Sequence, residues 1–195
     1  MISNIDICNM ALAQLGQGPI SSLEQEDERA RRCRLFYHPV RQEVLRTHNW
    51  AFATAEADLT PLGELEHAAG RYVYAYPQDC LFMRKVFEKT APERALSFKE
   101  LYRKEHPGRV LVCRAARARA EYTRDIKDAS IFDPAFVKAF SLALAADLAL
   151  TLTADSSLSQ RILQKYTLAL DEARRSNMTE NFEKPTAESA FVESR

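Results

Sequence analysis

A long apolar segment near the C-terminal end of the chain constrains the fold more than any other feature. Asp133 and Pro134 have the pattern of a helix N-cap followed by proline at the first helical position. Residues 135–153 then form a helix that is apolar on nearly all sides. The segment is about long enough to cross a bilayer, but Lys138 and Asp147 interrupt it. We therefore interpret it as a buried core helix.

Three further segments have the spacing of amphipathic helices, and two of them begin with a capping-box pattern. The first covers residues 4–15, the second runs from Ser21 or Ser22 towards His48, and the last runs from Ser157 to about Ser176. Pro39 lies inside the second segment and removes one backbone donor, so we expect it to bend or split that helix.

The middle of the chain has the pattern of short strands. Apolar and aromatic residues alternate there, and prolines divide the segments. The expected strands lie within residues 72–76, 81–87, 96–102 and 110–122. We expect this region to form a small antiparallel sheet or arm that shares the core of the helices.

Together these patterns predict a mainly α-helical chain with a β insertion, an α+β fold. The expected architecture is a four-helix bundle with a small antiparallel sheet or arm inserted between the second and third helices. Residues 1–49 and 132–176 would form one discontinuous helical domain, residues 50–131 the β-rich insertion, and residues 177–195 an extended C-terminal tail. The tail contains few apolar residues and has no reason to order in the isolated chain.

Charge limits the possible partners. The chain has 27 Lys and Arg against 27 Asp and Glu, and this balance argues against a constitutive, tight nucleic-acid binder. One basic run includes Arg31 and Arg34, which we expect to pair with nearby glutamates or to contact adjacent subunits. A second run lies between Arg114 and Arg124 and holds Arg117 and Arg119 on one side of a strand. Subunit contact, partner contact and contact with DNA in a channel all remain open for this second run.

The sequence gives no positive support for catalysis. Cys33 and His38 resemble a nucleophile and a base, but a separation of five positions turns them to different faces of a helix. Aspartates 125, 128 and 133 flank a junction between strand and helix, where aspartates normally cap and turn. The four cysteines are scattered without a C-x-x-C pair. We therefore predict no enzyme activity, no metal site and no cofactor. The N-terminal residues lack a secretion signal, so we expect the protein to begin in a cytoplasm.

Seven sequence strings stand out when they are taken in order along the chain: residues 7–16, 19–23, 33–41, 48–50, 76–81, 122–126 and 132–136. In this order they closely resemble the head-tail adaptor proteins of short-tailed phages, also called tail tubular protein A or the tail accessory factor. None of the strings is a catalytic motif, so the resemblance depends on their number and order over about residues 5–175.

The resemblance implies a structural virion protein. Subunits of this family form a dodecameric ring beneath the portal, extend the DNA channel and support tail attachment. The portal would lie above the ring, and a tail tube, nozzle or spike protein would lie below it. Genomic DNA would pass through without specific recognition. The C-terminal segment would dock on the portal, with Phe182, Phe191 and Val192 as its apolar anchors. The expected location is the virion at the head-tail junction, and the host cytoplasm before assembly.

Two other functions are compatible with the sequence. One is a DNA-binding or packaging-associated accessory protein, which a salt-sensitive interaction with duplex DNA would reveal. The other is a cytoplasmic enzyme, which would require a pocket that joins His38 or His48 to an acidic side chain.

Overall fold

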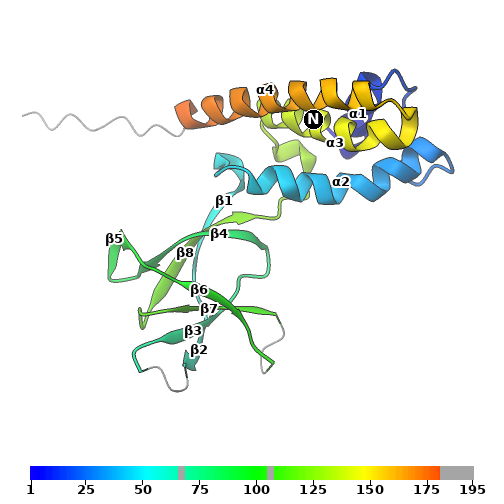
Figure 1. Ribbon diagram of the computed structural model, residues 1–195. Helices are drawn as coiled ribbons and strands as arrows, with labels where there is room; N and C mark the ends of the chain where they lie inside the picture. The colour runs from blue at the N-terminus through cyan, green and yellow to red at the C-terminus, as the bar shows by residue number, and fades with distance from the viewer. Residues whose placement is uncertain (66–68, 105–107, 181–195) are drawn as a thin grey trace, which may run out of the picture.

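A computed structural model describes residues 1–65, 69–104 and 108–180 of the chain. The described residues form four α-helices and eight strands, with two short 3-10 turns between them. The helices are α1 (Asn4–Gln14), α2 (Glu28–Arg46), α3 (Pro134–Thr153) and α4 (Ser156–Glu180). Figure 1 shows the helices gathered at one end of the molecule and the strands at the other.

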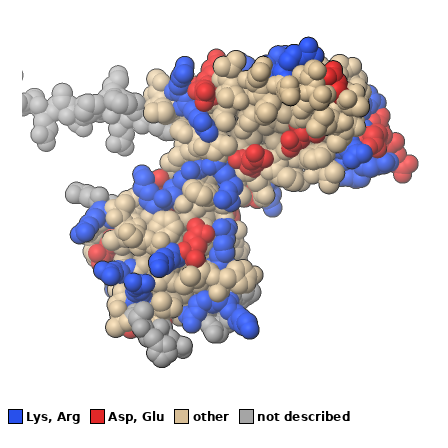
Figure 2. All heavy atoms as spheres, in the orientation of Figure 1, with Lys and Arg blue, Asp and Glu red and all other residues tan. Residues whose placement is uncertain are grey.

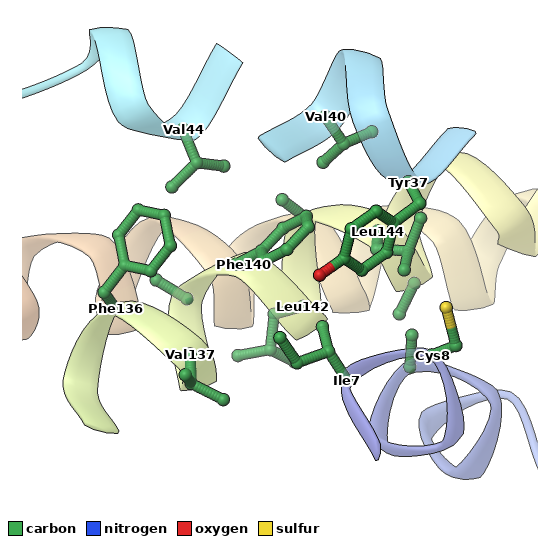
Figure 3. Packing of buried hydrophobic residues seen from close by; sticks show 14 of the residues in the cluster. Ile7, Cys8, Tyr37, Val40, Val44, Phe136, Val137, Phe140, Leu142 and Leu144 are labelled. Atoms are coloured by element: carbon green, nitrogen blue, oxygen red, sulfur yellow. The ribbon is translucent and has the colours of Figure 1, made fainter. Parts of the chain in front are cut away.

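Helix α3 is the centre of the helical part and contacts α1, α2 and α4. By length and composition α3 could cross a membrane, yet Phe136, Phe140 and Leu144 on it are fully buried among the other helices. In Figure 3, Phe140 and Leu144 of α3 point towards Tyr37 of α2, and Ile7 of α1 approaches from the other side. The apolar segment is therefore a core helix, as its sequence indicates.

Two antiparallel sheets of four strands make up the β part. One sheet has the order β1-β8-β4-β5 and the other the order β2-β3-β7-β6. The strands are β1 (Thr54–Asp58), β2 (Pro61–Glu64), β3 (Tyr72–Ala75), β4 (Cys80–Glu88), β5 (Ala91–Ala95), β6 (Lys99–Tyr102), β7 (Arg109–Cys113) and β8 (Ala118–Arg124). Met83 and Val86 from the first sheet pack with Tyr74 and Leu111 from the second, so the two sheets enclose a core of their own.

The predicted four-helix bundle with a small sheet or arm is wrong. The chain has an α+β fold in which two complete sheets cover each other. The strand-like pattern of the middle region identified five of the eight described strands, joined β7 and β8 into one, and missed β1, β2 and β5. The first of these, Thr54–Asp58, alternates alanine with acidic residues, and the second, Pro61–Glu64, contains both proline and glycine. Both form strands because they pair with neighbours in the sheets: β1 pairs with β8, and β2 pairs with β3.

The expected starts of two helices are also wrong. Helix α2 begins at Glu28 because Asp27 is its N-cap and accepts a hydrogen bond from the backbone N–H of Arg29. Hydrogen bonds from Arg29 lower the pKa of Asp27 to about 2, so this cap stays ionised. The backbone N–H and hydroxyl of Ser21 instead bond to the side chain of Gln25 in a local turn.

Helix α4 starts one residue before its expected position, with Asp155 accepting from the N–H of Leu158, and it continues past Ser176 to Glu180. Helix α2 continues through Pro39 without a break. Proline here leaves the carbonyl of Leu35 unpaired, and Leu35 lies on the exposed side of the helix, where water can bond to that carbonyl.

Candidate functional site

Two side chains that could have formed a catalytic pair lie in different environments. Cys33 of α2 is fully buried against Cys8 of α1, whereas His38 is exposed on α2. The hydrogen bond with Cys33, together with burial, raises the pKa of the Cys8 thiol. Cys8 is therefore an uncharged core group at neutral pH. Cys33 and His38 do not form a nucleophile and base pair.

His48 lies at the end of α2, next to the Trp50 ring, with 5.1 Å between the ring centroids. Burial lowers the pKa of His48, and the neighbouring charges of Arg174 and Arg84 lower it further. The imidazole is thus neutral at pH 7. Its Nε2 has no hydrogen-bond partner in the described part of the chain. The side chain packs the junction between helices and sheets.

The three aspartates near the start of α3 have structural roles. Asp128 caps the 3-10 turn Ala129–Ile131, and Asp133 caps α3 by accepting from the N–H groups of Ala135 and Phe136. Asp125 pairs with Arg41. Among the described residues, no group of three or more His, Cys, Asp or Glu side chains is arranged to hold a metal ion.

Arg41 is a buried cation that links α2 to the segment between β8 and α3. Its side chain is 1% exposed, and its Nη2 lies 2.7 Å from Oδ1 of Asp125. Its Nη1 donates to the carbonyl of Ile126, and Gln42 donates to the other carboxylate oxygen of Asp125 at 3.1 Å. Sequence reasoning missed this residue. The spacing of the helix could have indicated it. Arg41 lies four residues after Tyr37 and four before Leu45, so it shares the buried face of the helix with these two residues.

An aromatic cluster fills the same junction. The Phe136 ring lies 5.1 Å from Trp50, 5.0 Å from Phe52 and 5.0 Å from Phe132, measured between ring centroids. The indole N–H of Trp50 donates to the carbonyl of Val44 at 3.1 Å, which ties the cluster to the end of α2. Edge-to-face packing of this kind adds to the stabilisation from burial.

A third group of contacts fixes β4 to β8 near the helices. The hydroxyl of Tyr122 donates to one carboxylate oxygen of Asp79, and Arg124 donates to the other, each at 2.9 Å. At the opposite side of the junction, Asn177 of α4 accepts from the N–H of Ala51 and donates to the carbonyl of Asn49. Helices and sheets are therefore joined through contacts at several points.

The helical part has an apolar groove between α1, α3 and α4, which we call the helix groove. Its volume is about 470 Å³. Leu168 is 72% exposed there, and two polar contacts cross the groove: Lys138 pairs with Glu172 at 2.9 Å, and Lys165 donates to Gln14 at 3.4 Å. The apolar lining consists of Met10, Ala13, Leu142, Leu168 and Ala169.

A second exposed surface lies on α2, on the side turned away from the helical core, and we call it the outer face of α2. It is lined by Glu28, Arg31, Arg32, Arg34, Leu35 and His38, and the Leu35 side chain is 60% exposed. Arg31 pairs with Glu28 at 3.1 Å and Arg34 with Glu24 at 3.0 Å. Figure 1 shows α2 and α4 on opposite sides of α3, so this face and the helix groove point in different directions.

The second predicted basic run is dispersed in the structure. Arg117 is exposed in the turn before β8, and Arg119 is exposed within that strand. The alanines that alternate with them, Ala118 and Ala120, are buried, so the two arginines lie on the same side. Arg119 pairs with Glu56 on β1 at 3.0 Å. The predicted tail anchors Phe182, Phe191 and Val192 lie outside the described residues.

A scan against models of protein families finds none that fits this chain, and a search of curated proteins finds no similar one.

Proposed function

We propose that this protein is a head-tail adaptor, a structural subunit that forms a ring beneath a phage portal. The ring would extend the DNA channel and support tail attachment. Its partners would be further copies of the chain, the portal above and a tail protein below. This role requires neither a reaction nor a cofactor, and it places the protein at the head-tail junction of the virion.

One observation carries the proposal: five of the seven strings that resemble the adaptor family supply residues to the contacts at or beside the junction between helices and sheets. Arg41, Trp50, Asp125 and Phe136 take part in the contacts of the junction itself, and Asp79 bonds to β8 next to it. Much of the resemblance therefore concerns residues at the connection between the two parts. Such a connection suits a spacer whose two ends bind different partners.

The helical part has surfaces that suit a ring. A closed ring needs each subunit to present two different faces that fit one another. The helix groove is apolar and is crossed by ion-paired side chains, whereas the outer face of α2 presents exposed Leu35 among arginines. Because these faces lie on different helices, a copy could place Leu35 of one subunit against the groove of the next.

Mixing the purified protein with its cognate portal tests the proposal. We expect a ring of adaptor subunits on the portal, counted by native mass spectrometry or electron microscopy. Removal of residues 181–195 should abolish attachment to the portal, because it deletes Phe182, Phe191 and Val192. The deletion starts after Glu180 in order to keep Asn177, whose contacts with residues 49 and 51 stabilise the fold. Normal attachment of the shortened chain would contradict the assigned role of the tail.

Replacing Leu168 with Glu should prevent ring formation, because it places a charge in the apolar helix groove, where a neighbouring subunit would remove it from water. The effect on the single subunit should be small, since Leu168 is exposed. We expect at least about a tenfold loss of assembled rings, since a difference of about 1.4 kcal/mol is already tenfold. Leu163→Glu is the matched control, because Leu163 is exposed on α4 outside the groove. Equal assembly of both variants would exclude the helix groove from the ring contact.

A further inference from the structure

The β part contains a cationic groove that lies apart from the helical surfaces. It has a volume of about 500 Å³ and lies where the connection between β5 and β6 passes the end of β7. Four cationic side chains line it: Arg71, Arg94, Lys99 and Arg114. None of the other described residues that line it is acidic, and its apolar floor includes Leu96 and Phe98.

The charges of this groove are not neutralised within the described residues. Arg71, Arg94, Lys99 and Arg114 have no carboxylate partner there. By contrast, the exposed Arg109, Arg119 and Arg124 of the same β part each pair with a carboxylate. Figure 2 shows Lys and Arg side chains spread around the sheets, while acidic and basic side chains mix at the far end of the helices.

Strand pairing brings two of these arginines together. Tyr72 of β3 pairs with Cys113 of β7, and Arg71 precedes the first while Arg114 follows the second. Both arginines therefore lie just beyond the last residue pair of this ladder, at the same end of the sheet. Like charges brought close together in this way repel each other. A bound anion would reduce the repulsion between the two arginines and would therefore stabilise this arrangement.

We propose that the cationic groove binds the phosphate groups of a nucleic-acid backbone. Nucleic acid carries a dense and regular series of negative charges, so that several cations of one groove can be satisfied at once. Three of the four cations are arginines, whose planar guanidinium groups bind phosphate oxygens in pairs. An acidic peptide offers carboxylates at lower density and matches four clustered cations less well. The groove contacts the backbone without reading bases, so binding is independent of sequence.

This inference goes beyond the adaptor role, since a ring can form and transmit DNA without binding it. The balanced charge of the whole chain is compatible with such a local site, because four clustered cations act at short range even where the total charge is zero.

Fluorescence anisotropy with a labelled duplex of arbitrary sequence tests the inference on the full chain. The logarithm of the binding constant should fall with the logarithm of salt concentration between about 50 and 200 mM, with a slope of roughly −3 to −4 for four phosphate contacts. Arg71→Gln with Arg114→Gln should reduce the magnitude of that slope by about 2 and weaken binding at least about tenfold at low salt. Arg94→Gln with Lys99→Gln should act in the same way.

The control is Lys127→Gln with Arg161→Gln, which removes the same charge from two exposed cations outside the groove. An equal loss in the control and the groove variants would overturn the proposal, as would tighter binding of polyglutamate than of DNA. Ring assembly on the portal and DNA binding are also measured separately for the unmodified chain. Normal rings without DNA binding by the unmodified chain would refute the groove alone, whereas DNA binding without rings would refute the adaptor role alone.

Discussion

Replacing Phe136 with Ala is expected to lower the free energy of unfolding by about 3 to 5 kcal/mol. Phe136 is fully buried, and its ring contacts those of Trp50, Phe52 and Phe132 at the junction between helices and sheets. The substitution removes the central ring and leaves a cavity that rigid neighbours on three sides can fill only in part. Both the lost burial and the cavity destabilise the folded state.

Urea unfolding followed by the fluorescence of Trp50 measures this effect, since Trp50 is the sole tryptophan of the chain and lies 5.1 Å from Phe136. Circular dichroism of the helices provides a second probe. Leu150→Ala is the matched control on the same helix, because Leu150 is 57% exposed, and it should change stability by about 0.5 kcal/mol or less. A loss below about 1 kcal/mol for Phe136→Ala would show that the cluster does not hold the junction.

The helices could be predicted from local signals because their caps are local. Asp133 and Pro134 marked the start of α3. The Asp133 side chain accepts from the free N–H groups two and three residues later, Ala135 and Phe136. The start of α2 was predicted wrongly because three residues have the local pattern of a cap. Ser21 and Ser22 precede Asp27 in the sequence and compete with it as candidate N-caps. Only the packed structure shows which of these caps is followed by a helix.

The sheets could be predicted only in part, because pairing partners lie far apart in the chain. Glu56 of β1 faces Glu121 of β8, and no local pattern indicates that pairing. The two glutamates are also neighbours of Arg119 and Lys85, which pair with them. Charged side chains thus stabilise a strand that has little apolar character of its own.

The candidate sites could likewise be predicted only in part, because their residues come from separate segments of the chain. The arginines between positions 114 and 124 look like one basic run in the sequence, yet the structure separates Arg114 from Arg117 and Arg119. It groups Arg114 with Arg71, which precedes β3, and with Arg94 of β5. Charge density along the chain therefore did not predict charge density on the surface.

Replacing Arg41 with Met is expected to destabilise the fold by about 3 to 5 kcal/mol, because the half-buried carboxyl of Asp125 would lose its cationic partner and the carbonyl of Ile126 its donor. The reverse change, Asp125→Asn, should cost a similar amount, since the guanidinium of Arg41 is 1% exposed and would lose its anion. Hydrogen bonds from Arg41 to the carbonyl of Ile126 and from Gln42 to Asp125 belong to the same network.

The double variant separates the pair from its surroundings. If Arg41 and Asp125 act mainly on each other, the combined loss should be smaller than the sum of the single losses by about 0.5 to 3 kcal/mol. Simple addition of the two losses would mean that each side chain contributes through separate contacts, the bond to Ile126 for Arg41 and the bond to Gln42 for Asp125. Because this pair joins α2 to the segment that leads from β8 into α3, a strong coupling energy would also show that the ion pair helps to hold the helices to the sheets.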